Sequence, residues 1–253
     1  MKKLLYTLFT TVLFTATAFS QGEQRYADGA ATDQDGNTFE WINYGTQDWA
    51  IENAEVVTYR DGTEIPQVTD ATEWSNLTTG AWCYYDNDPT KGKLYNWYAV
   101  AGINDTDSNT PNKEFAPAGW HVPTDAEWTT LEEFLIANGY NYDGTTIENK
   151  IAKAMASRTG WDITIADGAP GNDQSLNNSS GFNAFPESLR SWFGTDNWDQ
   201  GYDANFCSST EISTDEVWGR ILGGLEGDGN GNSLDREIFY KQVGVSVRFV
   251  KDN

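Results

Sequence analysis

Histidine is nearly absent from this chain of 253 residues, which contains His121 and no other. A catalytic triad, or any other site that needs a histidine base, would have to be built on this one residue. His121 stands between Trp120 and Val122, just before a predicted helix, where a ring packs and bonds a backbone carbonyl. The sequence therefore argues against histidine-dependent hydrolysis.

Cysteine is almost as scarce, because Cys83 and Cys207 are the only two. The chain has no Cys-x-x-Cys pair and no Cys/His spacing typical of zinc ligands, which argues against a structural zinc site. In an oxidising compartment the two cysteines could form one disulfide that closes a very long loop. Because the sequence does not give the distance between them, it leaves this disulfide open.

Basic residues are few: 16 lysines and arginines stand against 38 aspartates and glutamates, a net charge of −22. Such a surface repels nucleic acid and anionic lipid, so neither is an expected partner. It attracts divalent cations, although solubility outside a cell explains the acidity more simply. The acidity does not indicate disorder, because 11 Trp, 12 Tyr and 12 Phe can build a large core.

Long apolar runs are missing too. The apolar stretch 4–14 follows two lysines and precedes Ala18-Phe19-Ser20, the pattern of a secretory signal peptide and its cleavage site. It is too short and too rich in threonine to span a membrane. We therefore expect a signal peptide at 1–20, a short leader at 21–31 and one domain at 32–253. The mature protein should be secreted or held at the cell surface, with no membrane span.

The clearest local structure is a helix that begins after Thr124. Thr124 and Glu127 form the capping-box pattern, and Trp128, Leu131 and Leu135 share one apolar face. Asn138-Gly139 provides the stop. A second helix is predicted over 146–157.

Turn signals dominate the remainder of the chain. Pairs such as Asp35-Gly36 and Asp61-Gly62 predict short antiparallel strands before residue 90. Beyond residue 162 we expect long irregular loops, closed by a strand over 244–250 with one face buried. The sequence thus predicts a single α+β domain with two helices, short antiparallel sheets and long irregular loops.

Several runs resemble the Fibrobacter succinogenes major paralogous domain, a family of secreted bacterial proteins. The most specific are LYNWYA at 94–99 and GWHVPT at 119–124, and the matching stretches are 35–37, 59–66, 94–100, 117–128, 181–186, 208–211 and 244–248. The resemblance covers nearly all of 32–251 and implies a C-type-lectin-like fold. The same broad fold includes formylglycine-generating enzymes, whose reactive cysteine pair is not matched here.

The chain departs from the family at several places. Ala116 and Phe249 stand where members often carry two cysteines, and Glu187-Ser188 stands where they carry Gly-Gly. The second departure puts the geometry of that turn in doubt.

A calcium site is one candidate in the second half. Asp228, Asn230 and Asn232 place oxygen side chains at alternate positions, with Asp235 close by. The glutamate that a calcium loop needs at position 12 is Phe239 here, so plain solvated turns are the competing explanation.

A ligand-binding face is the other candidate. Aromatic rings with polar edges suit sugars and protein ligands alike. The residues expected to form this face are Trp192, Trp198, Asp199, Tyr202 and Asn205. Core packing is the competing explanation for most rings of this half, and Trp218 is expected to be buried.

These observations favour a secreted, non-catalytic binding module that recognises a glycan or protein ligand in adhesion or recognition at the bacterial surface. Two alternatives stay open. One is an extracellular enzyme that acts on polysaccharide through a carboxylate pair, because 38 acidic residues always offer pairs. The other is a structural subunit of a surface assembly.

Overall fold

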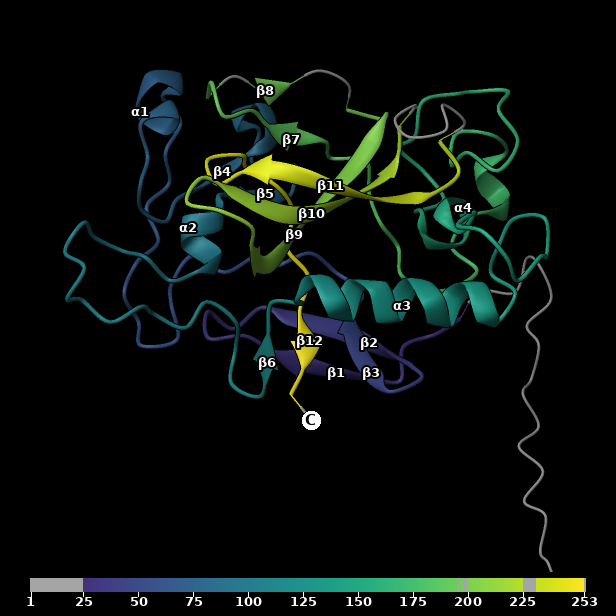
Figure 1. Cartoon of the computed structure of the whole chain (residues 1–253), viewed down its shortest axis with the longest axis horizontal. Coiled ribbons are helices and arrows are strands. Elements are labelled where there is room, and N and C mark those ends of the chain that lie inside the picture. Colours follow the sequence, from purple (N-terminus) through teal and green to yellow (C-terminus); the bar gives the residue numbers. More distant parts are fainter. Residues whose placement is uncertain (1–24, 195, 198–199, 225–230, 253) are drawn as a thin grey trace, which may run out of the picture.

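The computed structural model describes residues 25–194, 196–197, 200–224 and 231–252 (Figure 1). The predicted signal peptide and the first residues of the predicted leader lie outside this part. The leader's last residues already belong to the fold, because Gly29–Thr32 forms the first strand, β1.

A five-stranded antiparallel sheet brings the two ends of the described chain together. Its order is β1-β2-β3-β12-β6, with β2 at Thr38–Tyr44, β3 at Gln47–Ala50, β12 at Val250–Lys251 and β6 at Trp120–His121. Asp33 shapes the turn between β1 and β2, since its Oδ1 accepts the backbone N–H groups of Asp35 and Asn37 at 2.9 Å. The turn predicted at this position is confirmed.

The second half contains longer strands than the sequence predicts. β9 (Asp203–Glu211), β10 (Glu216–Gly223) and β11 (Leu234–Tyr240) form an antiparallel sheet in the order β11-β10-β9. Irregular loops were expected here, and the prediction is wrong because buried and exposed residues alternate along β11 as in a half-buried strand. Two small sheets pair β4 (Trp82–Tyr84) with β5 (Lys93–Tyr95), and β7 (Leu189–Arg190) with β8 (Asp196–Asn197).

One helix is long. α3 covers Asp125–Ala137, and Thr124 and Glu127 form the predicted capping box. The three other α-helices in the described residues are short: α1 (Ala71–Ser75), α2 (Trp97–Val100) and α4 (Ala152–Met155).

Of the helix predicted over 146–157, the structure contains only α4. The Asn141 side chain prevents an earlier start, because its Nδ2 donates to the carbonyls of Ile147 and Glu148 and its Oδ1 accepts the Lys150 N–H. Side-chain bonds of this kind compete with helix formation. Glu148 accordingly adopts a φ of 61°, outside the helical region.

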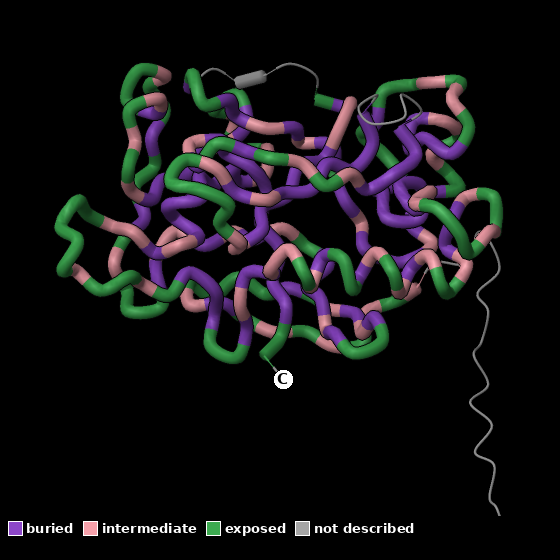
Figure 2. The backbone as a smooth tube through the Cα atoms, in the orientation of Figure 1, coloured by how far each residue is buried: buried purple, intermediate pink, exposed green. Residues whose placement is uncertain are grey.

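α3 lies between the five-stranded sheet and the β9–β10–β11 sheet (Figure 1). Trp128 packs its ring 4.6 Å from that of Trp49 on β3 and 5.5 Å from that of Phe206 on β9, and its Nε1 donates to the Cys207 carbonyl at 3.1 Å. Buried chain follows this layer through the middle of the molecule (Figure 2). One aromatic side chain thus joins helix and both sheets.

The C-terminal run differs from its prediction. Residues 243–250 are all buried, and regular strand structure is limited to β12, with single bridges at Gly244, Val245 and Ser246. The run passes between sheets instead of covering one, so both its faces are buried.

The two cysteines occupy different parts of the core. Cys83 packs with Trp74 and Leu94, whereas Cys207 belongs to the cluster that contains Tyr95 and Phe249. Both are buried, and the structure does not join them in a disulfide.

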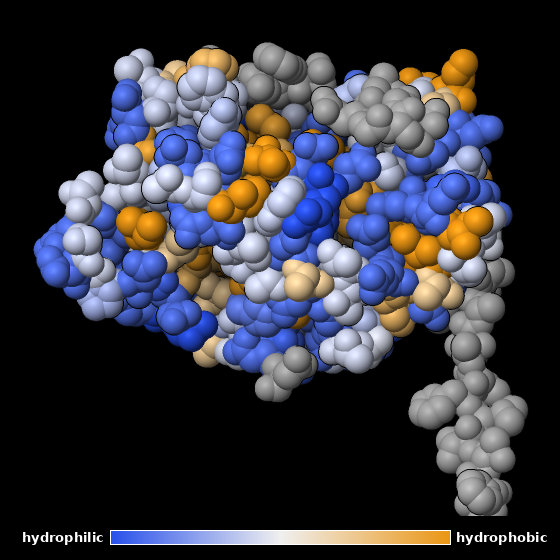
Figure 3. All heavy atoms as spheres, viewed as in Figure 1, coloured by the Kyte–Doolittle hydropathy of each residue, from blue (hydrophilic) through white to orange (hydrophobic). Residues whose placement is uncertain are grey.

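The surface agrees with the composition. The face seen in Figure 3 is largely hydrophilic, with apolar side chains in small separate patches. Within the described ranges, no helix is long and apolar enough to cross a membrane.

Together these elements make a mixed α+β fold of antiparallel sheets around one principal helix.

Candidate functional site

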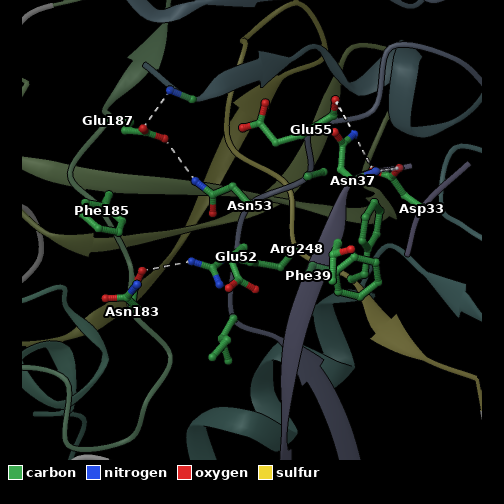
Figure 4. A pocket seen from close by; sticks show the side chains of 15 residues that line it. Asp33, Asn37, Phe39, Glu52, Asn53, Glu55, Asn183, Phe185, Glu187 and Arg248 are labelled. Carbon is green, nitrogen blue, oxygen red and sulfur yellow. Dashed lines mark hydrogen bonds between the residues drawn. The ribbon is translucent and has the colours of Figure 1, made fainter. Parts of the chain in front are cut away.

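A pocket of about 270 Å³ opens beside the five-stranded sheet (Figure 4). Its lining comes from five segments that are far apart in the sequence: 33–39, 51–55, Gly92, 183–187 and 248–249. Four carboxylates line it together with one guanidinium, that of Arg248. We call it the Glu187 pocket.

Glu187 is held by two hydrogen bonds. Its Oε1 accepts the Gly92 backbone N–H at 2.8 Å, and its Oε2 accepts from Asn53 Nδ2 at 3.1 Å. A side chain at position 92 would overlap this carboxylate, so glycine lets Glu187 occupy its present position. Burial raises the pKa of Glu187 above its usual value, because neither partner carries a positive charge.

Arg248 forms the floor of the pocket and is only 1% exposed. Its Nη1 donates to the carbonyls of Ala50 and Phe182 at 3.2 Å, and its Nη2 donates to that of Asn183 at 3.3 Å. Burial lowers the pKa of Arg248 to about 10, so the guanidinium stays charged at neutral pH.

Glu52 is the second carboxyl group of the pocket with a raised pKa, and partial burial is again the main cause. Its Oε2 accepts the Glu40 backbone N–H at 2.7 Å. The other two acids have local roles: Glu55 pairs with Lys93, and both Asp33 oxygens hold the β1–β2 turn. Glu52 and Glu187 are thus the two acids of the pocket that burial makes harder to ionise.

Two buried polar atoms of the pocket lack a hydrogen-bond partner among the described residues. They are Asn53 Oδ1, an acceptor, and Arg248 Nε, a donor. Figure 4 shows the Asn53 oxygen turned away from Glu187, toward the space near Phe185 and Glu52. Buried polar groups are normally satisfied, so such atoms indicate a place for a ligand or water.

Sequence reasoning missed this pocket because no single stretch of chain contains it. The one signal was Glu187-Ser188, where the family resemblance leads one to expect Gly-Gly. Ser188 keeps a φ of 51°, in the left-handed region that glycine adopts freely. The turn is therefore retained, and the first of the two positions contributes a carboxylate to the pocket.

A second feature is an exposed aromatic surface on the β10–β11 hairpin. Trp192 stacks on Phe193 with ring centroids 3.7 Å apart and lies 5.5 Å from the ring of Tyr240. Ile238 follows on the same side of β11, and Trp218 is opposite it on β10. We call these five residues the aromatic face.

The aromatic face is both exposed and fixed. Trp192, Phe193, Ile238 and Tyr240 are between 44 and 59% exposed. Arg236 covers the ring of Trp218, with its guanidinium carbon 3.3 Å from the centroid, and bonds Asp125 at 2.7 and 2.9 Å. Trp218 is consequently half-buried, where the sequence suggested a fully buried ring.

The predicted ligand-binding residues do not lie together in the structure. Trp192 lies in the aromatic face, and Trp198 and Asp199 lie outside the described residues. Tyr202 is half-buried and lines another pocket, beside Trp161. Asn205 is fully buried on β9, with Nδ2 donating to Asp203 at 2.7 Å, so it is a core residue and not a surface contact.

The calcium prediction falls partly outside the described residues, which exclude Asp228 and Asn230. Asn232 is buried, and Asp235 accepts a hydrogen bond from Ser233 Oγ at 2.8 Å. Within 25–194, 200–224 and 231–252, no three His, Cys, Asp or Glu side chains are grouped so that they could hold a metal.

His121 is an ion-pair residue. Its Nε2 lies 2.8 Å from Glu127 Oε1 and its Nδ1 lies 2.8 Å from Asp252 Oδ1, so carboxylates replace the backbone carbonyl that was expected. The bond to Glu127 is the main reason that the pKa of His121 rises to about 9. The ring is therefore protonated at neutral pH and is not available as a base there.

Comparison with known proteins gives one match. The family described as Fibrobacter succinogenes major domain matches residues 42–251. No curated protein and no solved structure matches the chain.

Proposed function

The chain belongs to the Fibrobacter succinogenes major domain family, and we propose that it is a secreted or cell-surface, non-catalytic binding module that recognises a glycan. The observation that carries this proposal is the aromatic face. Exposed rings that contact one another, with the Arg236 guanidinium over one of them, suit the apolar faces and hydroxyl groups of sugars.

We also propose a C-type-lectin-like fold. The family resemblance implies one principal α+β domain with a long irregular region. In support, residues 138–188 contain only α4 and one short 3₁₀ turn at Gln174–Leu176 between α3 and β7.

The non-catalytic part of the proposal is supported by the state of His121. A protonated imidazole paired with two carboxylates is a poor general base at neutral pH.

One observation favours the alternative, hydrolysis of polysaccharide. The Glu187 pocket contains an acid with a raised pKa, Glu187, and an acid paired with a lysine, Glu55, and different environments of this kind separate proton donors from ionised partners. Release of reducing ends from polysaccharides tests this alternative, and Glu187→Gln should abolish any such activity.

Binding to glycan and surface-protein arrays tests the main proposal. Trp192→Ala and Tyr240→Ala should each weaken glycan binding by about tenfold or more, because each removes a stacking ring. Tyr26→Ala is the matched control, since Tyr26 is an exposed aromatic residue outside the aromatic face. Binding of proteins alone would replace the glycan with a protein ligand, and an empty result on both arrays would contradict the proposal.

A further inference from the structure

We propose that the Glu187 pocket binds one sugar unit that is uncharged or carries an amine, and that it does so separately from the aromatic face. This inference rests on the proposed recognition of glycans and names the class of sugar that is selected. It starts from the two unpartnered atoms, Asn53 Oδ1 and Arg248 Nε.

A hydroxyl group has the hydrogen-bonding capacity that each atom needs. Asn53 Oδ1 needs a donor and Arg248 Nε–H needs an acceptor, and a hydroxyl is both. The carboxylates of Glu52 and Glu187 add acceptors at the same place. A ligand with several adjacent hydroxyls therefore fits better than an aliphatic or purely cationic one.

The charge of the pocket selects among sugars. Four carboxylates face one guanidinium, and within the described part of the chain the other cation paired with them is Lys93, which bonds Glu55. Arg248 offsets only part of the charge of the four carboxylates, so the pocket keeps an excess of acidic groups, which repels another carboxylate and attracts an ammonium group. Uronic and sialic acids are thus excluded, and neutral or amino sugars are favoured.

The shape of the pocket limits the ligand to one ring. A volume of about 270 Å³ is slightly below the range of roughly 300–1,000 Å³ that is usual for drug-sized ligands. Phe185, which is 41% exposed, offers a flat apolar wall for the C–H face of a sugar.

The acceptors are fixed before a ligand arrives. Asn53 Nδ2 donates to Glu187 Oε2 and also to Ser246 Oγ, both at 3.1 Å. These two bonds set the orientation of the amide and direct Oδ1 away from Glu187 (Figure 4). Preorganisation of this kind lowers the entropic cost of binding.

Calorimetric titration of the purified protein with glucose, glucosamine and glucuronate tests the proposal. We expect glucosamine to bind at least as tightly as glucose, and glucuronate to bind about tenfold more weakly or not at all. Equal or tighter binding of glucuronate would overturn the proposal. So would the absence of saturation with all three sugars, which would leave the two polar atoms to water.

Variants locate the binding. In Glu187→Gln the new side-chain oxygen can still accept the Gly92 N–H. Its new NH2 group can donate to Asn53 Oδ1 once the Asn53 amide has turned over. The fold should therefore be kept, while the Glu187 carboxylate and Asn53 Oδ1 are no longer available as acceptors for a sugar. Glucose binding should fall about tenfold in Glu187→Gln and in Phe185→Ala. It should stay unchanged in Glu133→Gln, an exposed acid on α3. Unchanged binding in both pocket variants would overturn the proposal.

The same titrations separate the two proposals. If Trp192→Ala loses array binding and retains glucose binding, the two sites are independent, as we expect. Wild-type array binding without glucose binding would remove the pocket proposal alone. Glucose binding with empty arrays would remove the proposed function and leave the pocket.

Discussion

The aromatic face and the Glu187 pocket are built in opposite ways. The aromatic face comes from one hairpin and the adjacent Trp192–Phe193 pair, and its rings contact one another directly. The pocket takes its lining from five distant segments, and its central acid depends on Asn53, which precedes it by 134 residues. The face should thus depend on local strand pairing, and the pocket on the packing of the whole domain.

The two regions also differ in their charged side chains. The five residues of the aromatic face carry no charge, and the Arg236–Asp125 ion pair lies beside them. The pocket encloses acids whose charge is not fully compensated, which costs stability. Retention of such groups is typical of sites kept for function.

The largest expected effect is that of Trp128→Ala. Trp128 is fully buried between the two sheets, so its truncation should destabilise the protein by about 3–5 kcal/mol. Because both regions depend on this core, glucose and array binding should decline together. Chemical denaturation measures the change in the free energy of unfolding, and Glu133→Gln on the same helix should stay within about 0.5 kcal/mol of wild type. If the aromatic face kept its binding while the pocket lost it, the hairpin would be independent of the core.

Gly92→Ala should separate the two regions. The added methyl overlaps the Glu187 carboxylate, which must move away from its position beside the backbone N–H of residue 92. Because this carboxylate is the end of a flexible side chain, the loss of stability should stay below about 1–3 kcal/mol, the usual cost of overpacking a core. Glucose binding should be lost while array binding through Trp192 persists. Lys91→Ala is the neighbouring control and should affect neither. Retention of glucose binding in Gly92→Ala would show that Glu187 does not need its present position.

The contrast between local and long-range contacts also explains how much of each region could be predicted from the sequence. The capping box at Thr124 and the turn at Asp35-Gly36 are signals within a few residues, and each could be predicted. The helix predicted over 146–157 was too long, because Asn141 bonds backbone groups six to nine residues away.

The pocket could not be predicted at all. Asn53, Glu187 and Arg248 have no sequence relation that would bring them together, and only tertiary structure does so. The strands β9 to β11 were also missed, because their glycines, asparagines and serines suggested loops. Pairing between strands outweighs such local preferences.

Glu187→Gln should show how much the buried charge of Glu187 lowers the free energy of unfolding. The pKa of Glu187 is raised in the folded protein, so the folded state holds this proton more tightly than the unfolded chain does. The free energy of unfolding therefore falls as pH rises from the usual glutamate value of 4.5 through the raised value, and it stays lower above. The variant lacks this loss, so at pH 7 it should be more stable by roughly 1 kcal/mol, or about 2–4 °C in Tm.

Thermal unfolding at several pH values measures this effect. Glu133→Gln controls for the change in net charge. A variant that is less stable than wild type at neutral pH would mean that the bonds to Gly92 and Asn53 outweigh the burial of the charge.

The smallest expected effect is that of His121→Gln, which lies outside both regions. Paired with Glu127 and Asp252, His121 has a pKa raised to about 9, so its contribution is fully present below about pH 6.5 and is lost as pH rises through about 9. Because the ring is partly exposed and solvent weakens such pairs, the contribution at pH 7 should be below about 1 kcal/mol. Stability measured from pH 6 to 10 should decline more in wild type than in the variant, with glucose and array binding equal in both proteins. If the variant bound glucose or the arrays differently, His121 on β6 would contribute to binding. The aromatic face and the Glu187 pocket would then not be the whole of the binding surface.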